Sequence, residues 1–231
     1  MNAARPAFEN LREEMVDQIR ARGVESPRVL RAMGRVRRER YVPSCLGEFA
    51  YEDSALPIEE EQTISQPYIV AFMLDALGLL GDEKVLEIGT GSGYAAAVLG
   101  EIVREVYTIE RHDKLARTAA ERLARDGYGN VHVRHGDGTL GWSEQAPFDG
   151  IVVAAGGPSV PESLRQQLAI GGRLVIPVGD APGHQQLVRV TRTAADQFQE
   201  ERLAKVRFVP LVGAAGWRAP TAETVPIPRQ S

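Results

Sequence analysis

Apolar residues recur three and four positions apart through much of the first third of the chain, which is the spacing of one buried helix face. The pattern predicts three helices, at residues 8–22, 27–42 and 67–77, each ended by a glycine or a proline. Residues 43–62 lack periodicity and contain prolines and a run of acids. They are predicted to form a surface loop, and a loop of this length is usually functional.

From residue 85 the pattern changes to short apolar runs that alternate with helical spacing. The runs predict strands at residues 85–88, 106–109, 131–133, 151–153 and 174–176, and the helical spacing predicts helices at 94–102, 114–125 and 161–168. Apolar strands that alternate with helices are typical of a parallel sheet covered on both faces, with right-handed crossovers. The sequence therefore predicts an α/β fold with a doubly wound, mostly parallel sheet and an N-terminal helical extension.

The last part of the chain has a different pattern. Residues 186–193 alternate apolar and polar, residues 203–212 do so more weakly, and no long helix separates them. They predict an antiparallel pair at the sheet edge, in an order that the sequence leaves open. We predict one domain over residues 1–217 and a flexible, proline-rich tail over residues 218–231. Within the domain, the predicted parts are an N-terminal, substrate-side segment (1–80), a cofactor-binding core (81–180) and C-terminal strands (181–217).

Composition narrows the classes of protein. A chain of 231 residues that is 43% hydrophobic can bury one large core, and a net charge of −4 argues against a nucleic-acid binder. The single cysteine, Cys45, excludes an internal disulfide framework, and the four histidines, taken as surface or strand-edge residues, show no metal-ligand spacing. We find no apolar run of membrane-spanning length and no leader-like N-terminus. We therefore expect a cytoplasmic monomer that binds neither metal, membrane nor nucleic acid.

The clearest chemical signal is the glycine-rich stretch of residues 89–93, GTGSG, between the first predicted strand and its helix. Such a turn points backbone N–H groups and the helix dipole at a bound anionic group. A dinucleotide fingerprint needs glycine where Tyr94 stands, and it lacks an acid at the position of Glu87. The pattern E-x-G-x-G-x-G instead resembles the first motif of class I S-adenosylmethionine-dependent methyltransferases. The alternative is a turn that only packs strand against helix.

Two further acids follow predicted strands, and ligands of open α/β sheets bind at such strand ends. Glu110 follows the glycine turn by about twenty residues, a position from which a carboxylate can accept hydrogen bonds from both ribose hydroxyls. Asp137, between Gly136 and Gly138, is a candidate to bind the adenine amino group. The alternatives are an acid that interacts with a helix dipole at Glu110 and a simple Asp-Gly turn at Asp137.

Several segments together, spread over most of the chain, resemble the protein-L-isoaspartate O-methyltransferase family. They are RERYVP (38–43), QTISQPYIVA (62–71), VLEIGTGSGY (85–94), GDGTLGW (136–142), APFDGIVVAAG (146–156), VPESLRQQLAIGGRLVIPVG (160–179) and VRFVPL (206–211). QTISQPY is the discriminating segment, because other class I methyltransferases share the glycine loop and lack it. The sequence departs from the family pattern at residues 155–157 and in the proline-rich end.

The resemblance implies a class I, Rossmann-like methyltransferase that uses S-adenosyl-L-methionine, releases S-adenosyl-L-homocysteine and methylates isoaspartyl residues in damaged proteins and peptides. It implies Ser65 as the catalytic residue. The implied substrate-binding residues are Thr63, Ile64, Ser65, Gln66, Val209, Pro210 and Leu211. The implied cofactor-binding residues are Glu87, Gly89, Thr90, Gly91, Gly93, Glu110, Asp137 and Gly138.

The chemistry needs no general base, because a carboxylate with a pKa of about 4 is already ionised at neutral pH. The task that remains is to align oxygen, methyl carbon and sulfur and to exclude water. Ser65 would donate a hydrogen bond that aims the substrate carboxylate; its alternative role is to cap the next helix. Other hypotheses are a methyltransferase for a small molecule, RNA or a dedicated partner peptide, and a non-catalytic, cofactor-sensing protein.

Overall fold

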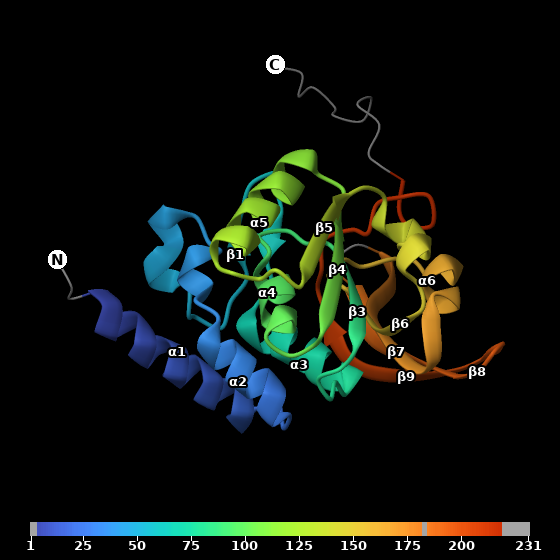
Figure 1. The fold of residues 1–231 in the computed structure, drawn as a ribbon, viewed down its shortest axis with the longest axis horizontal. Coiled ribbons are helices and arrows are strands. Elements are labelled where there is room, and N and C mark those ends of the chain that lie inside the picture. The colour runs from blue at the N-terminus through green and yellow to red at the C-terminus, as the bar shows by residue number, and fades with distance from the viewer. Residues whose placement is uncertain (1–3, 182–183, 219–231) are drawn as a thin grey trace, which may run out of the picture.

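The apolar runs in the middle of the chain form the central strands of a seven-stranded sheet. The computed structural model describes residues 4–181 and 184–218, and its strand order is β5-β4-β3-β6-β7-β8-β9 (Figure 1). The strands are β3 (Lys84–Ile88), β4 (Glu105–Glu110), β5 (Val131–His135), β6 (Phe148–Val153), β7 (Leu168–Ala181), β8 (His184–Ala194) and β9 (Gln197–Val206). β3 to β7 pair in parallel, and β8 is antiparallel to both β7 and β9. The predicted fold class is confirmed, and the order of the last strands is now defined.

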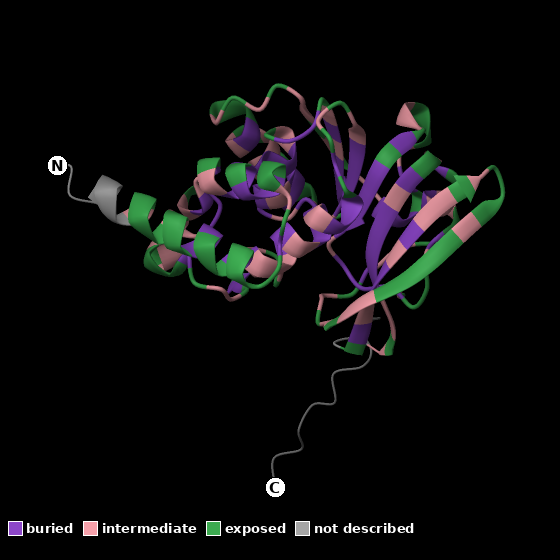
Figure 2. Ribbon diagram, turned by 90° about the horizontal axis from the view of Figure 1, so that it is seen from below, coloured by how far each residue is buried: buried purple, intermediate pink, exposed green. Residues whose placement is uncertain are grey.

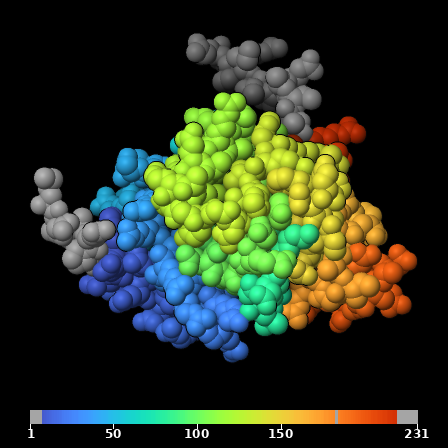
Figure 3. Space-filling view, in the orientation of Figure 1, coloured from blue at the N-terminus to red at the C-terminus, as the bar shows by residue number. Residues whose placement is uncertain are grey.

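Six α-helices occur in the described part of the chain. They are α1 (Ala4–Ala21), α2 (Pro27–Arg35), α3 (Pro67–Leu77), α4 (Tyr94–Gly100), α5 (Asp113–Arg125) and α6 (Glu162–Gln166). Figure 3 shows the N-terminal helices, in blue, and the C-terminal strands, in orange, at opposite sides of the central residues, in green. Gly78 ends α3 as predicted, because its left-handed backbone (φ 68°) suits glycine. None of the helices among the described residues is long and apolar enough to cross a bilayer.

Both faces of the sheet are buried because neighbouring residues of each strand contribute to different apolar clusters. Val85 and Val152 pack with residues of α1 to α5, whereas Leu86 and Ile151 pack with Leu164 of α6. Figure 2 shows the continuous burial of these central strands. Burial on both faces explains why the strands have uninterrupted apolar sequences. The buried sheet therefore fixes the positions of the residues at the carboxyl ends of its strands, where a site can form.

Several predicted elements differ from the observed ones. The predicted loop at residues 43–62 contains a 3-10 helix, Ser44–Phe49, and a small hairpin formed by β1 (Leu56–Pro57) and β2 (Thr63–Ile64). The second helix ends earlier than predicted and is followed by the 3-10 turn Arg38–Arg40.

The last strand was predicted at residues 203–212, whereas β9 ends at Val206. Its edge position leaves most of its side chains exposed, so burial imposes little alternation on its sequence. Apart from Arg218, the predicted tail lies outside the described residues.

Candidate functional site

The glycine-rich stretch joins β3 to α4 through three residues with left-handed backbone. Gly89, Gly91 and Gly93 have φ values of 92°, 53° and 89°, a region that side-chain-bearing residues rarely adopt. The requirement for glycine is therefore conformational, and it brings the loop around the carboxyl end of β3. The start of α4 follows directly at Tyr94.

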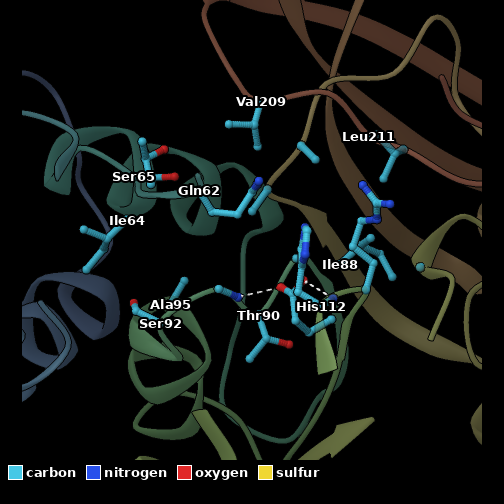
Figure 4. A pocket seen from close by; sticks show the side chains of 18 of the residues that line it. Gln62, Ile64, Ser65, Ile88, Thr90, Ser92, Ala95, His112, Val209 and Leu211 are labelled. Atoms are coloured by element: carbon cyan, nitrogen blue, oxygen red, sulfur yellow. Dashed lines mark hydrogen bonds between the residues drawn. The ribbon is translucent and has the colours of Figure 1, made fainter. Parts of the chain in front are cut away.

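A pocket lies over this loop, at the carboxyl ends of β3, β4 and β6. It holds about 790 Å³ of empty space, including the part open to solvent. Eleven predicted site residues line it: Thr63, Ile64, Ser65, Gly89, Thr90, Gly91, Glu110, Gly138, Val209, Pro210 and Leu211. In Figure 4, Ser65 and Val209 lie at the end of the pocket away from Thr90. The structure thus brings the predicted cofactor and substrate segments together around one cavity.

Glu110 connects the end of β4 to the glycine loop. One carboxylate oxygen accepts a hydrogen bond from the Gly91 N–H at 2.9 Å, and the other accepts one from the His112 N–H at 2.9 Å (Figure 4). Only 4% of the residue is exposed. Each carboxylate oxygen has a second lone pair, so this group can still accept hydrogen bonds from a ligand in the pocket.

Glu87 lies beneath the pocket and does not line it. The residue is completely buried, one carboxylate oxygen accepts a hydrogen bond from the Thr108 hydroxyl at 2.5 Å, and the other has no hydrogen-bond partner among the described residues. Burial raises the pKa of Glu87 to about 8, the Thr108 hydrogen bond opposes this rise, and the Glu110 charge adds to it. The predicted direct contact between Glu87 and the cofactor stays a prediction.

Thr108 links Glu87 to the pocket wall. Its hydroxyl oxygen lies 2.6 Å from that of Thr90, and both side chains are buried. Either of the two threonine hydroxyls can be the donor in this contact. A hydrogen-bonded chain therefore runs from the buried acid to a residue that lines the pocket.

Asp137 does not line the pocket but connects two segments beside it, at Thr139 and Ala214. Its carboxylate accepts hydrogen bonds from the Thr139 N–H and hydroxyl, at 2.9 and 2.7 Å, and from the Ala214 N–H at 2.8 Å. Partial burial alone would raise the pKa of Asp137, but these hydrogen bonds and the charge of Arg111 lower it overall. Its neighbour Gly138 lines the pocket and accepts no larger residue, because an added Cβ would lie 2.3 Å from Ile88 Cγ2.

Two other predicted residues also lie outside the pocket lining. Gly93 faces Ala119 and Leu123 of α5, where an added Cβ would make ordinary contacts. Gln66 donates its amide N–H groups to the backbone and carboxylate of Asp53. Their predicted ligand contacts stay predictions.

Ser65 stands between β2 and α3 at the mouth of the pocket. The N-cap of α3 is Gln66, whose side chain makes no cap hydrogen bond, and Pro67 occupies the first turn. The alternative in which Ser65 caps this helix is therefore wrong. Pro67 has no N–H to satisfy, and the next N–H, that of Tyr68, donates to the Asp53 carboxylate at 3.0 Å.

Sequence reasoning missed several lining residues. They include Gln62, Ile88, Ser92, Tyr94, Ile109, Arg111 and His112. His112 was predicted only to be a surface or strand-edge residue, and it lines the pocket two positions after the end of β4 at Glu110. Tyr94 was noticed only as a departure from a dinucleotide motif. The guanidinium carbon of buried Arg38 lies 4.7 Å from the centroid of the Tyr94 ring, a cation–π contact. Tyr94 therefore also connects the pocket to the N-terminal part of the chain.

A mostly parallel sheet with antiparallel C-terminal strands, and a glycine-loop pocket at its carboxyl edge, define a class I, Rossmann-like methyltransferase. The sequence profile of the family "Protein-L-isoaspartate(D-aspartate) O-methyltransferase" matches residues 9–216. The chain belongs to this family.

Curated relatives and solved structures agree. The chain is 60% identical to a Rhodopseudomonas palustris protein-L-isoaspartate O-methyltransferase over 203 residues, which cover 88% of this chain and 93% of the relative. It is 59% identical to protein-L-isoaspartate O-methyltransferase 1 of Geotalea uraniireducens over 197 residues, covering 85% and 90%. A solved protein-L-isoaspartate O-methyltransferase superposes with a TM-score of 0.80 at 30% identity. The superposition covers 89% of this chain and 67% of the solved one. The structure of a Plasmodium falciparum beta-aspartate methyltransferase in complex with S-adenosyl-L-homocysteine superposes with a TM-score of 0.75 at 25% identity. The superposition covers 86% of this chain and 96% of the solved one.

Proposed function

We propose that this protein transfers a methyl group from S-adenosyl-L-methionine to the free α-carboxylate of L-isoaspartyl residues in damaged proteins and peptides, which initiates their repair. One observation carries the proposal. The segment that discriminates the family, with Ser65 at its centre, lies at the mouth of the glycine-loop pocket, which Val209 and Leu211 also line. A methyl donor and a protein carboxylate could therefore meet at one point.

The residues of the pocket fit the proposed cofactor. Glu110 presents a buried carboxylate with free lone pairs, suited to two vicinal ribose hydroxyls. Ile88 and Ile109 supply apolar surface beside Gly138, suited to a flat base. The loop at Gly89 and Gly91 leaves room for backbone contacts with an amino-acid end. When bound, S-adenosyl-L-methionine would supply an activated methyl group on a cationic sulfur.

The chain's own residues then need to position the acceptor. The Ser65 hydroxyl would donate to one oxygen of the substrate carboxylate and turn the other toward the methyl group. Val209 and Leu211 would cover the reacting atoms and exclude water. No residue is required to remove a proton, because the acceptor is already ionised at neutral pH. The proposed catalysis is thus orientation in a largely dry pocket.

The isomer's geometry supplies the selectivity. An isoaspartyl residue has one extra methylene in the backbone, so its α-carboxylate is free where a normal chain has a peptide bond. The proposal predicts methylation of an isoaspartyl peptide and no comparable methylation of its aspartyl twin. Incubation of both peptides with radiolabelled cofactor measures this. Equal labelling of the two peptides would contradict the proposal and favour a different methyl acceptor.

A further inference from the structure

A second hollow opens beside the pocket, on the substrate side of Ser65. It shares Thr63, Ser65, Ala154 and Val209 with the pocket, and it holds about 1000 Å³ of empty space, including the part open to solvent. We call it the flanking groove. Gln66 and Ile69 form one wall, and Lys205, Arg207 and Phe208 form the other.

The flanking groove is locally positive. Lys205 and Arg207 are exposed, lie two positions apart at the end of β9, and both line the groove. Within the described residues, neither forms an ion pair. The described residues that line the groove include no aspartate or glutamate. This cationic wall contrasts with the net charge of −4 of the whole chain.

The groove continues along β9, away from Ser65. Lys205 and Val206 also line the next hollow, which contains both acids and bases, and there Arg165 is paired with Glu200. Among the charged residues that line the flanking groove, by contrast, all are bases. An extended peptide advances about 3.3 Å per residue, so a few residues beside the methylated one would lie within reach of Lys205 and Arg207.

We propose that the flanking groove receives the substrate chain on one side of the methylated residue, and that Lys205 and Arg207 select an acidic side chain there. The inference rests on the proposed function, because the groove leads away from the serine that would hold the isoaspartyl carboxylate. An acidic side chain in the groove meets two cations, whereas a basic one meets repulsion. The chain's negative net charge acts in the opposite direction, so a preference for acid has to arise locally.

A set of isoaspartyl peptides tests the inference. A neutral parent peptide is varied by placing Asp or Lys at each of three positions on either side of the isoaspartyl residue. We expect Asp to raise kcat/KM about two- to tenfold over Lys, on one side only, and the ratio to shrink at high salt. Equal kcat/KM values for the Asp and Lys peptides, or the same preference on both sides, would overturn it.

Failure of this inference is separable from failure of the proposed function. If the neutral parent is methylated but charge has no effect, the groove does not select acids and the proposed function stands. If no isoaspartyl peptide is methylated, the proposed function itself is wrong.

Charge reversal locates the effect. The double variant Lys205→Glu, Arg207→Glu is expected to lose or invert the Asp-to-Lys ratio, with thermal melting as a check on folding. The control with the same change in net charge is the double variant Arg31→Glu, Arg104→Glu, because both arginines are exposed and neither lines the flanking groove or the pocket. It should keep the ratio of the unmodified protein. A Lys205→Glu, Arg207→Glu variant that keeps this ratio would overturn the inference.

Discussion

At the scale of single residues, Ser65 is half-buried at the pocket mouth and has no role in starting α3, whose N-cap is Gln66. Ser65→Ala is expected to lower kcat for an isoaspartyl peptide about tenfold to a thousandfold, because the reacting oxygen loses its orientation. Cofactor affinity and melting temperature should stay nearly unchanged. Steady-state kinetics, calorimetry and thermal melting measure the three quantities. A variant that melts several degrees lower and turns over normally would give this serine a structural role only.

Glu87 should make the folding stability depend on pH. Its pKa is about 8 in the folded protein, above the ordinary 4.5, so the folded state keeps a proton that the unfolded state loses. This contribution is fully present below pH 4.5, falls as pH rises, and is lost above about 8.

Glu87→Gln removes this dependence. Between pH 5 and pH 8 the unmodified protein should lose a few kcal/mol of unfolding free energy relative to the variant, since one pKa unit corresponds to about 1.4 kcal/mol. Urea unfolding of both proteins at the two pH values tests this. Parallel pH profiles would show that Glu87 is ionised in the folded protein.

At the scale of elements, Thr108 couples β3 and β4 below the glycine loop. Glu87 and Thr108 face each other in the parallel register of these strands, and Thr90 adds the loop to the same hydrogen-bonded chain. Thr108→Val leaves both neighbours without a partner, and each buried polar group left unpaired costs about 1–3 kcal/mol. We expect lower stability and weaker cofactor binding.

The conservative variant separates hydrogen bonding from packing. Thr108→Ser retains the hydroxyl, so it should bind cofactor nearly as well as the unmodified protein. Calorimetric titration of both variants gives the comparison. Similar cofactor affinities for the valine and serine variants would mean that the hydrogen bonds of Thr108 do not position the glycine loop.

The same elements show what the sequence alone could and could not predict. Strands buried on both faces have apolar sequences, so β3, β4 and β6 were predictable, whereas β9 was misplaced because an edge strand is hardly patterned by burial. The partnership of Glu87 with Thr108 depends on strand register, which no local pattern encodes. The pocket position of His112 likewise depends on the end of β4. The sequence motifs predicted which segments meet at the pocket. Contacts between residues of neighbouring strands could be identified only from the structure.

At the scale of the whole molecule, Trp217 makes the last contacts toward the sheet that the structure describes. Its indole N–H donates to the Gly156 carbonyl at 2.9 Å, and its backbone N–H donates to the Leu211 carbonyl at 2.7 Å. We therefore propose that residues 1–217 suffice as one folding and catalytic domain. A chain ending at residue 217 should match the full chain in melting temperature and in kcat/KM. A chain ending at residue 211 is the control that loses these contacts, and it should melt lower. Loss of activity at 217 would contradict the proposed boundary.

The two backbone hydrogen bonds to Glu110 also have a thermodynamic meaning for the whole protein. They hold the carboxylate in one rotamer before any ligand arrives. A glutamate side chain loses about 1.5–2 kcal/mol of conformational entropy when it is fixed. Folding has already imposed this loss, so ligand binding need not repeat it. Glu110 is therefore preorganised for binding. Part of the affinity of the pocket depends on the folding stability of the residues around the end of β4.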